Sequence, residues 1–326
     1  MTHVTQSRST AGIAFVLAGM AAISVNDMLI KQLSNAYPLH QIVFTRSAIG
    51  LTFSLVLVQM EGGWRILKTR QPVAHLIRCF LVIISNMSFF LALAVIPLAD
   101  ATALFFAAPL FITVLSIPIL GEKVGPLRIG AVLVGFCGVL IMQRPWAGSE
   151  TLSADRLVLL LPVMAALTYA LMQLMTRQLG VTSKASALAV YMQIMFVIVS
   201  AVFWLVAGDG RFVDANSSAS LTFLLRAWTW PVQGDWAPFI GLGLNSAIIG
   251  YCLAQAYRLS DAATVAPFEY ALLPMAVFWG WLRWSDLPDL EIWIGMALIV
   301  ASGLFVFLRE KQKTRRVART AIKTRY

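Results

Sequence analysis

The residues LALAVIPLADATALFFAAP at positions 91–109 recur in altered form as LAQAYRLSDAATVAPFEYA at positions 253–271. A shift of 162 positions aligns six identical residues in the two copies. Each copy runs on through two long apolar stretches, which are separated by one short polar turn, GEKVGP or RWSDLPD. Further along, two glycines recur with the same spacing, Gly130 and Gly138 as Gly295 and Gly303. A period of about half the chain is too long for a solenoid, so it predicts two related halves.

The composition is that of a membrane protein, because 59% of the residues are hydrophobic and 12% are charged. In soluble proteins about 45–50% of the residues are hydrophobic and about 25% are charged. Apolar runs of roughly 20 residues match the thickness of a bilayer. We expect ten membrane spans, at residues 11–31, 38–60, 73–96, 99–120, 126–144, 157–177, 185–207, 237–257, 262–283 and 290–308. Residues 11–25 are interpreted as part of the first span, since Arg8 alone is a weak positive region for a signal peptide.

The ten spans divide into a first repeat of five at residues 1–148 and a second repeat of five at residues 149–308. A basic tail at residues 309–326 follows them. Because five is an odd number, the second repeat must enter the membrane in the opposite orientation. We therefore predict an all-α integral membrane protein with two inverted five-helix repeats, an architecture that is common among secondary transporters.

The basic residues predict that both termini lie in the cytoplasm. With this orientation, 17 Lys and Arg residues fall on the cytoplasmic side, eight of them in the tail, and six fall on the other side. This distribution explains the net charge of +10 as attraction to an anionic lipid bilayer, and it argues against nucleic-acid binding. Tryptophans form an expected belt at the outer boundary, at Trp146, Trp204, Trp228, Trp230, Trp236, Trp284 and Trp293.

The longest connection, residues 208–236, falls on the outer side. Its second part, LTFLLRAWTW, is amphipathic. We favour a lipid-facing surface segment here. A cap over the outer entrance is the alternative.

The chain resembles the EamA-type members of the drug/metabolite transporter superfamily. The resemblance rests on the PLADATALFFAAPLF run, on Asn26-Asp27 with Lys31, on Arg46 after Pro38, and on the Gly121-Glu122 turn. It implies alternating-access transport of a small organic metabolite across the bacterial inner membrane. The pattern is most similar to the riboflavin transporters of this superfamily, and next to its S-adenosylmethionine uptake carriers; export of amino acids or other metabolites is a further alternative.

Glu269 is the strongest candidate for substrate binding or proton coupling. An ionisable group in mid-span is costly and normally faces the bundle interior or a water-filled cavity. Pro267 and Pro274 flank it and remove backbone donors, so the helix is expected to bend there. Pro109 interrupts the 99–120 span at the corresponding place. A structural pairing of Glu269 with the buried cation Arg46 is the alternative, and Arg46 itself is a candidate either for binding or for such a pair.

Other charged residues in the spans are interpreted as structural. Asp27 and Lys31 are spaced for an i,i+4 pair. Asp100 and Asp261 stand where two spans begin, and N-capping explains both. Glu122 lies in a tight turn.

Neutral polar residues in the spans are expected to add hydrogen-bonding groups to a cavity. Tyr169 and Gln173 share one helix face. The set suits a planar, mostly neutral substrate, although each member alone is explained by interhelical hydrogen bonding. The residues are Asn86, Tyr169, Gln173, Tyr191, Gln193, Asn245, Tyr251, Gln255 and Tyr270.

Motifs for other functions do not occur in the sequence. It contains no Gly-Lys pair, which excludes the nucleotide-binding loop of a primary pump. The three histidines have no second ligand at metal spacing, and the three cysteines lie inside apolar spans. We therefore expect no enzyme activity, no metal and no cofactor; a membrane-embedded enzyme is the rival class, and the sequence leaves homodimer formation open.

Overall fold

The computed structural model describes residues 2–69, 71–121, 125–144, 146, 156–179, 185–214, 216–259 and 266–323, and every regular element in them is a helix. The expected spans correspond to α1 (Thr2–Leu33), α2 (Leu39–Glu61), α3 (Pro72–Leu93), α4 (Leu98–Phe105) with α5 (Ala108–Leu120), α6 (Pro126–Gln143), α7 (Arg156–Leu179), α8 (Ala185–Ala207), α10 (Trp236–Leu259), η4 (Ala266–Ala271) with α12 (Leu272–Trp284), and α13 (Leu290–Lys323). Short helices in the connections are η1 (Trp64–Leu67), α9 (Ala219–Leu225) and η3 (Gln233–Asp235). By length and composition, seven of the described segments are able to cross a membrane.

The fourth span of each half is interrupted at equivalent positions, as the prolines predict. In the first half α4 ends at Phe105, and α5 begins three residues later with Pro109 in its first turn. In the second half the short 3₁₀ helix η4 passes directly into α12. A proline has no N–H to donate and cannot continue the regular hydrogen-bond ladder. The interruptions therefore bring irregular backbone into the interior of the bundle, where other parts of the protein cover it.

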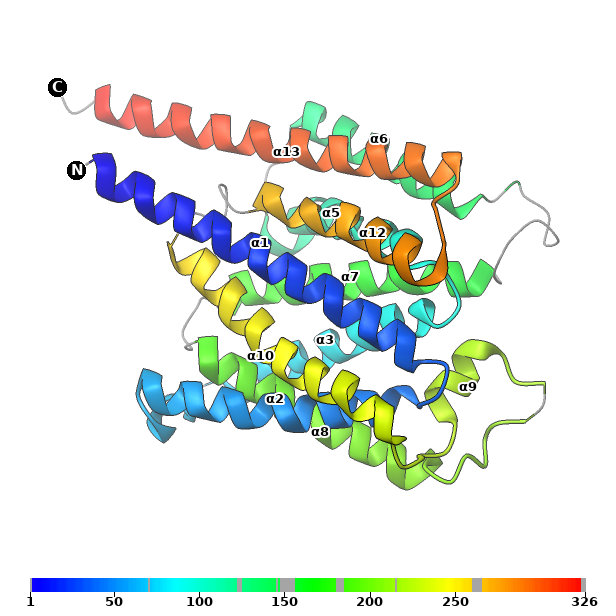
Figure 1. Ribbon diagram of the computed structural model, residues 1–326. Helices are drawn as coiled ribbons and strands as arrows, with labels where there is room; N and C mark the ends of the chain where they lie inside the picture. Colours follow the sequence, from blue (N-terminus) through cyan, green and yellow to red (C-terminus); the bar gives the residue numbers. More distant parts are fainter. Residues whose placement is uncertain are drawn as a thin grey trace.

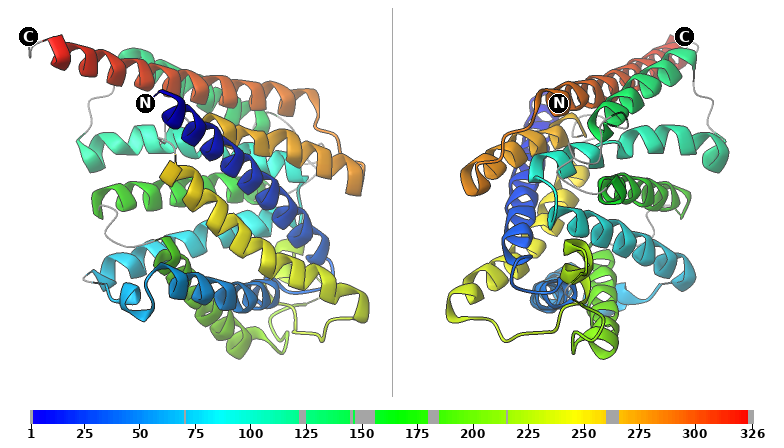
Figure 2. Two further views of the ribbon diagram at one scale, coloured as in Figure 1. Left: turned by 60° about the vertical axis from the view of Figure 1, so that its left-hand side comes forward. Right: turned by 90° about the vertical axis from the view of Figure 1, so that its right-hand side faces the viewer.

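Equivalent helices of the two halves make equivalent contacts (Figures 1 and 2). Helix α1 of the first half packs against α10 of the second. The counterpart of α1 is α7, the counterpart of α10 is α3, and these two also pack against each other. Counterparts also pack directly on each other, in the pairs α2 with α8, α4 with α12, and α6 with α13. This pattern is what an approximate two-fold axis between the halves requires.

The two ends of the bundle differ. Figure 1 shows both chain termini at one end, here called the terminal end, and α9 at the other, here called the α9 end. The described glycines Gly138 and Gly295 lie where α6 and α13 cross: a Cβ on Gly138 would lie 2.7 Å from the Gly295 carbonyl oxygen. Such close backbone contact is typical of helix association in membranes, where packing rather than water exclusion supplies the driving force.

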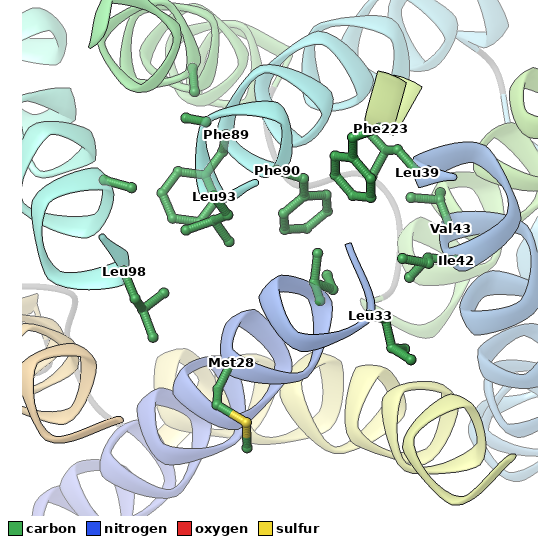
Figure 3. Packing of buried hydrophobic residues seen from close by; sticks show 14 of the residues in the cluster. Met28, Leu33, Leu39, Ile42, Val43, Phe89, Phe90, Leu93, Leu98 and Phe223 are labelled. Carbon is green, nitrogen blue, oxygen red and sulfur yellow. The ribbon is translucent and has the colours of Figure 1, made fainter. Parts of the chain in front are cut away.

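Buried apolar side chains form two clusters in the described residues. One cluster contains Leu33, Leu39, Leu93 and Phe223, all fully or nearly fully buried, and Figure 3 shows them gathered between the helices. A second cluster surrounds the interrupted helices and includes Phe106, with Tyr270 packed against it. The interrupted region therefore lies within a packed apolar group.

Candidate functional site

Glu269 lies in η4, half buried, beside two tyrosines. Its carboxylate interacts electrostatically with Tyr169 of α7 and with Tyr270. The Tyr169 hydroxyl accepts a hydrogen bond of 2.7 Å from Gln173 Nε2, so the shared face expected for these two residues is present. The group combines a carboxylate, two hydroxyls and an amide at the middle of the bundle.

Aromatic rings connect this group to both halves. Phe105 of α4 lies 5.4 Å from Tyr169 and 5.3 Å from Phe89 of α3, measured between ring centroids. Phe106 lies 5.0 Å from Tyr270. These distances are those of favourable aromatic pairs. The two tyrosines that interact with Glu269 are thus packed against rings from the first half.

Arg46 forms a second charged group, closer to the α9 end. Its side chain is 7% exposed, and its guanidinium lies 5.4 Å from the ring centroids of both Phe90 and Phe196. Asp27 of α1 attracts it electrostatically, and Asn26 Nδ2 donates a 3.1 Å hydrogen bond to the Asp27 carboxylate. Asp27 is therefore a carboxylate that acts on Arg46.

Two buried atoms of this group have no hydrogen-bond partner among the described residues, Arg46 Nε and Asn26 Oδ1. Buried polar atoms without partners are rare because they lose their contacts with water and gain nothing in exchange. The arrangement leaves one donor and one acceptor available in a ring-lined site.

Lys31 does not pair with Asp27, so the expected i,i+4 contact is wrong. The amine instead donates to the main-chain oxygens of Leu93, at 3.0 Å, and Ile96, at 2.6 Å. The last carbonyls of a helix have no partner within it and attract a cation. Leu93 ends α3, and Ile96 follows in the connection to α4, so Lys31 binds carbonyls at and just beyond the end of this helix.

Asp100 is not an N-cap. The residue that precedes α4 is Pro97, whose side chain makes no capping hydrogen bond, and Asp100 lies in the first turn of the helix. There its negative charge is placed favourably toward the positive end of the helix dipole. Asp261 and Glu122, the other two structural assignments, lie outside the described residues.

Most other polar candidates with a hydrogen bond make it to another element, as expected for interhelical hydrogen bonding, and Asn86 bonds within its own helix. Asn86 Nδ2 donates to the main-chain oxygen of Val82 at 3.0 Å, one turn earlier. Tyr191 donates to the main-chain oxygen of Leu67 at 2.6 Å, toward the terminal end. The remaining candidates are placed as follows: Asn245 donates to the main-chain oxygen of Ala22, Gln193 to Ser246 Oγ at 3.4 Å, Gln255 is half buried in α10, and Tyr251 is exposed.

Phe89, Phe90, Phe105 and Phe196 escaped the sequence reasoning, which treated phenylalanines as packing. Their rings contact the charged or polar groups described above. A ring that packs on a guanidinium and a ring that packs on another apolar side chain look the same in one sequence. The sequence offered one signal for these residues, the adjacency of Phe89 and Phe90 on a span with few polar residues.

Residues 208–214 and 216–235, here called the cap, lie at the α9 end and pack in part against the bundle, which favours the alternative of a cap. Phe223 of α9 is 1% exposed and enters the core between α2 and α3. The side-chain amide of Gln41 makes two hydrogen bonds to the main chain of Thr229. Its Nε2 donates to the carbonyl at 2.6 Å, and its Oε1 accepts from the N–H at 3.3 Å. Arg226 donates to the Asn35 carbonyl at 2.6 Å. Phe223 is therefore buried in protein, whereas Leu221 and Trp230 of the same stretch are exposed.

Comparisons with known proteins agree with this fold. Residues 10–144 match the EamA-like transporter family. A riboflavin transporter of Vibrio cholerae is 31% identical and covers 94% of this chain and 93% of its own length. One of Rhizobium johnstonii is 28% identical over 97% of both chains, and an S-adenosylmethionine uptake transporter of Rickettsia prowazekii is 25% identical over 92% of this chain and 94% of its own.

A solved crystal structure with 18% identity shares the fold, with a TM-score of 0.60 over 93% of this chain and 98% of the other. The matches to the curated relatives extend through both halves. This chain is therefore a multi-pass bacterial membrane transporter of small metabolites, and it belongs to the EamA-like transporter family of the drug/metabolite transporter superfamily, in the branch of the bacterial riboflavin transporters.

Proposed function

We propose that this protein takes up riboflavin across the bacterial inner membrane by alternating access. The moving units are the halves at residues 1–148 and 149–308, and the terminal end, with the basic tail 309–326, faces the cytoplasm. The identity to three riboflavin transporters, 28–31%, supports the substrate. The excess of Lys and Arg residues on one side of the spans supports the orientation.

The observation that carries the proposal is the ring-lined group around Glu269. The riboflavin ring system is planar, nearly neutral and rich in hydrogen-bond donors and acceptors. Phe105 and Phe106 offer ring faces for stacking, the amide of Gln173 and the hydroxyl of Tyr169 offer donors and acceptors, and the Glu269 carboxylate accepts an N–H. Ligand sites in proteins combine such apolar walls with a few polar groups that set orientation.

Alternating access fits the position of this group. It lies at the interrupted fourth spans, and its rings come from both halves. In transporters with inverted repeats, the substrate site lies near mid-membrane between the repeats, and one repeat rocks against the other. Arg46 and Asp27 lie between this site and the cap, and we assign them to substrate passage or coupling.

The test is uptake of radiolabelled riboflavin by a riboflavin auxotroph that carries the transporter. Glu269→Gln keeps the size of the side chain and removes its charge, so we expect uptake to fall at least about tenfold, which corresponds to about 1.4 kcal/mol. Glu291→Gln is the matched control, because Glu291 is exposed at the start of α13 and pairs with Arg144 at 3.4 Å. Wild-type uptake by Glu269→Gln, with an unchanged pH profile, would rule out the role of Glu269.

Uptake of S-adenosylmethionine is the second candidate. A carboxylate among aromatic rings also suits a sulfonium cation, since ring faces attract positive charge. A relative in Rickettsia prowazekii carries that name. Competition separates the two: excess unlabelled S-adenosylmethionine leaves riboflavin uptake unchanged if riboflavin is the substrate, and riboflavin uptake is absent at the outset if it is not.

A further inference from the structure

Lys31 lies in the last turn of α1, at the α9 end. Its side chain is almost completely buried, because 9% of the residue's surface is exposed. Its amine contacts three features at once. It donates to the Leu93 and Ile96 carbonyls of the α3–α4 connection and lies 5.4 Å from the ring centroid of Trp284, at the end of α12. Asp286 and Asp100 add electrostatic attraction. Lys31 therefore joins elements of both halves.

Neighbouring contacts strengthen the same connection. Arg283 of α12 donates to Gln32 Oε1 of α1 at 2.8 Å. Leu98, the first residue of α4, has no exposed surface. The α9 end is thus closed by α1, α12 and the α3–α4 connection, with Lys31 at the place where they meet.

The repeat predicts the same contact nearer the terminal end, and the structure does not make it there. In the repeat, Gly130 is equivalent to Gly295 and Gly138 to Gly303. Exchanging the halves therefore turns the contact of Gly138 with Gly295 into a contact of Gly303 with Gly130, nearer the terminal end. A Cβ on Gly130 would meet no described atom within 4 Å, and the space at Gly303 is filled by the Tyr270 hydroxyl instead of by α6. The close Gly–Gly contact of α6 and α13 is therefore not repeated nearer the terminal end, although the two helices stay close as far as Gly135 and Ser302.

We propose that Lys31 is a positioning residue for transport, a latch that holds the α9 end closed in this state and must release before substrate enters from that side. A cation is suited to this function because its contacts are with carbonyl oxygens and a ring face, all of which water can replace when the end opens. The latch acts through the helices and does not touch the Glu269 group. This inference rests on the proposed alternating-access function.

Thiol labelling with a membrane-impermeant reagent tests the latch. The background replaces Cys79, Cys137 and Cys252, and single cysteines report on each end: Leu98→Cys at the α9 end and Gln255→Cys toward the terminal end. Lys31→Met removes the charge and the donors. We expect labelling of Leu98→Cys to rise about fivefold and labelling of Gln255→Cys to fall, because the variant shifts the population toward the state that is open at the α9 end.

Three variants make the result specific. Lys31→Arg keeps a cation with donors and should restore at least part of the original labelling. Lys31→Gln retains a donor without the charge, and it serves as the second variant if Lys31→Met does not reach the membrane. Lys68→Met applies the same chemical change to an exposed lysine beside η1 and should leave both reporters unchanged.

The latch is overturned if labelling of Leu98→Cys is the same in Lys31→Met and in the background, or if both reporters rise together, which indicates loosening of the whole fold. Labelling needs no substrate. Failure of riboflavin uptake with opposite shifts at the two reporters therefore counts against the proposed substrate alone. Unchanged reporters with active uptake count against the latch alone.

Discussion

The α9 end and the terminal end are built from repeated sequence, yet they pack differently. At the α9 end, α6 and α13 touch through Gly138 and Gly295, and the cap covers the ends of the helices. At the terminal end, the counterpart Gly130 faces open space, and Gly303 receives Tyr270. Two halves of common ancestry can therefore pack in two different ways. If the halves exchange these two packing arrangements, an inverted repeat opens toward the other side of the membrane.

The buried charges show the same asymmetry. A shift of 146 positions, which aligns the start of α1's membrane span with the start of α7's, places Asp27 opposite Gln173 and Arg46 opposite Met192. The first half therefore keeps a buried pair of opposite charges near the α9 end, whereas the equivalent positions of the inverted second half, which lie toward the terminal end, hold neutral residues. A charge pair in the membrane is costly to form and costlier to break, so it marks a place where function outweighs stability.

Arg46→Ala should have the largest effect, because it leaves Asp27 buried without its cation. Removing one partner of a buried pair typically costs about 3–5 kcal/mol. We expect a large drop in the melting temperature of the detergent-solubilised protein and loss of uptake. Arg65→Ala, at an exposed arginine in η1, is the matched control and should melt like the wild type. A melting temperature unchanged in both variants would show that Asp27 does not depend on Arg46.

Gly138→Ala and Gly130→Ala compare the two ends directly. The new methyl group at position 138 would press on the Gly295 carbonyl and lie 3.0 Å from Leu298 Cβ. Overpacking of this kind costs about 1–3 kcal/mol. At position 130 the methyl group has room, and we expect no loss of stability. Equal melting temperatures for the two variants would contradict the unequal packing of α6 and α13.

Gln41→Ala should loosen the cap without unfolding the bundle. It removes two hydrogen bonds to Thr229, at about 1 kcal/mol each. The expected readout is faster amide hydrogen exchange in residues 219–229, with exchange in α6 and α13 unchanged. Gln143→Ala removes a side-chain hydrogen bond to the Leu159 carbonyl and serves as the control, since it lies outside the cap. Protection of the cap at the wild-type level in Gln41→Ala would show that Phe223 alone anchors it.

The ten-span pattern, the interrupted fourth spans and the Tyr169–Gln173 contact were predictable from sequence, because each depends on local periodicity or on proline chemistry. The partners of Arg46 and Lys31 were not. Both side chains are long, and which carboxylate or carbonyl they reach depends on how distant helices cross. The same reason explains the cap: an amphipathic stretch such as residues 219–230 buries its apolar face equally well in lipid or in protein, and only the packing of Phe223 decides between them.

Asp289→Asn should have the smallest effect and tests how much of the α9-end packing is electrostatic. Asp289 accepts from Arg144 at 2.9 Å, which joins the ends of α6 and α13. The Asp289 side chain is 69% exposed, so water and salt screen the pair, and we expect a loss of at most about 1 kcal/mol. The difference in melting temperature from the wild type should shrink further in high salt. A larger loss that persists in high salt would mean that the charges, and not the close contact of Gly138 with Gly295, hold these two helices together at the α9 end.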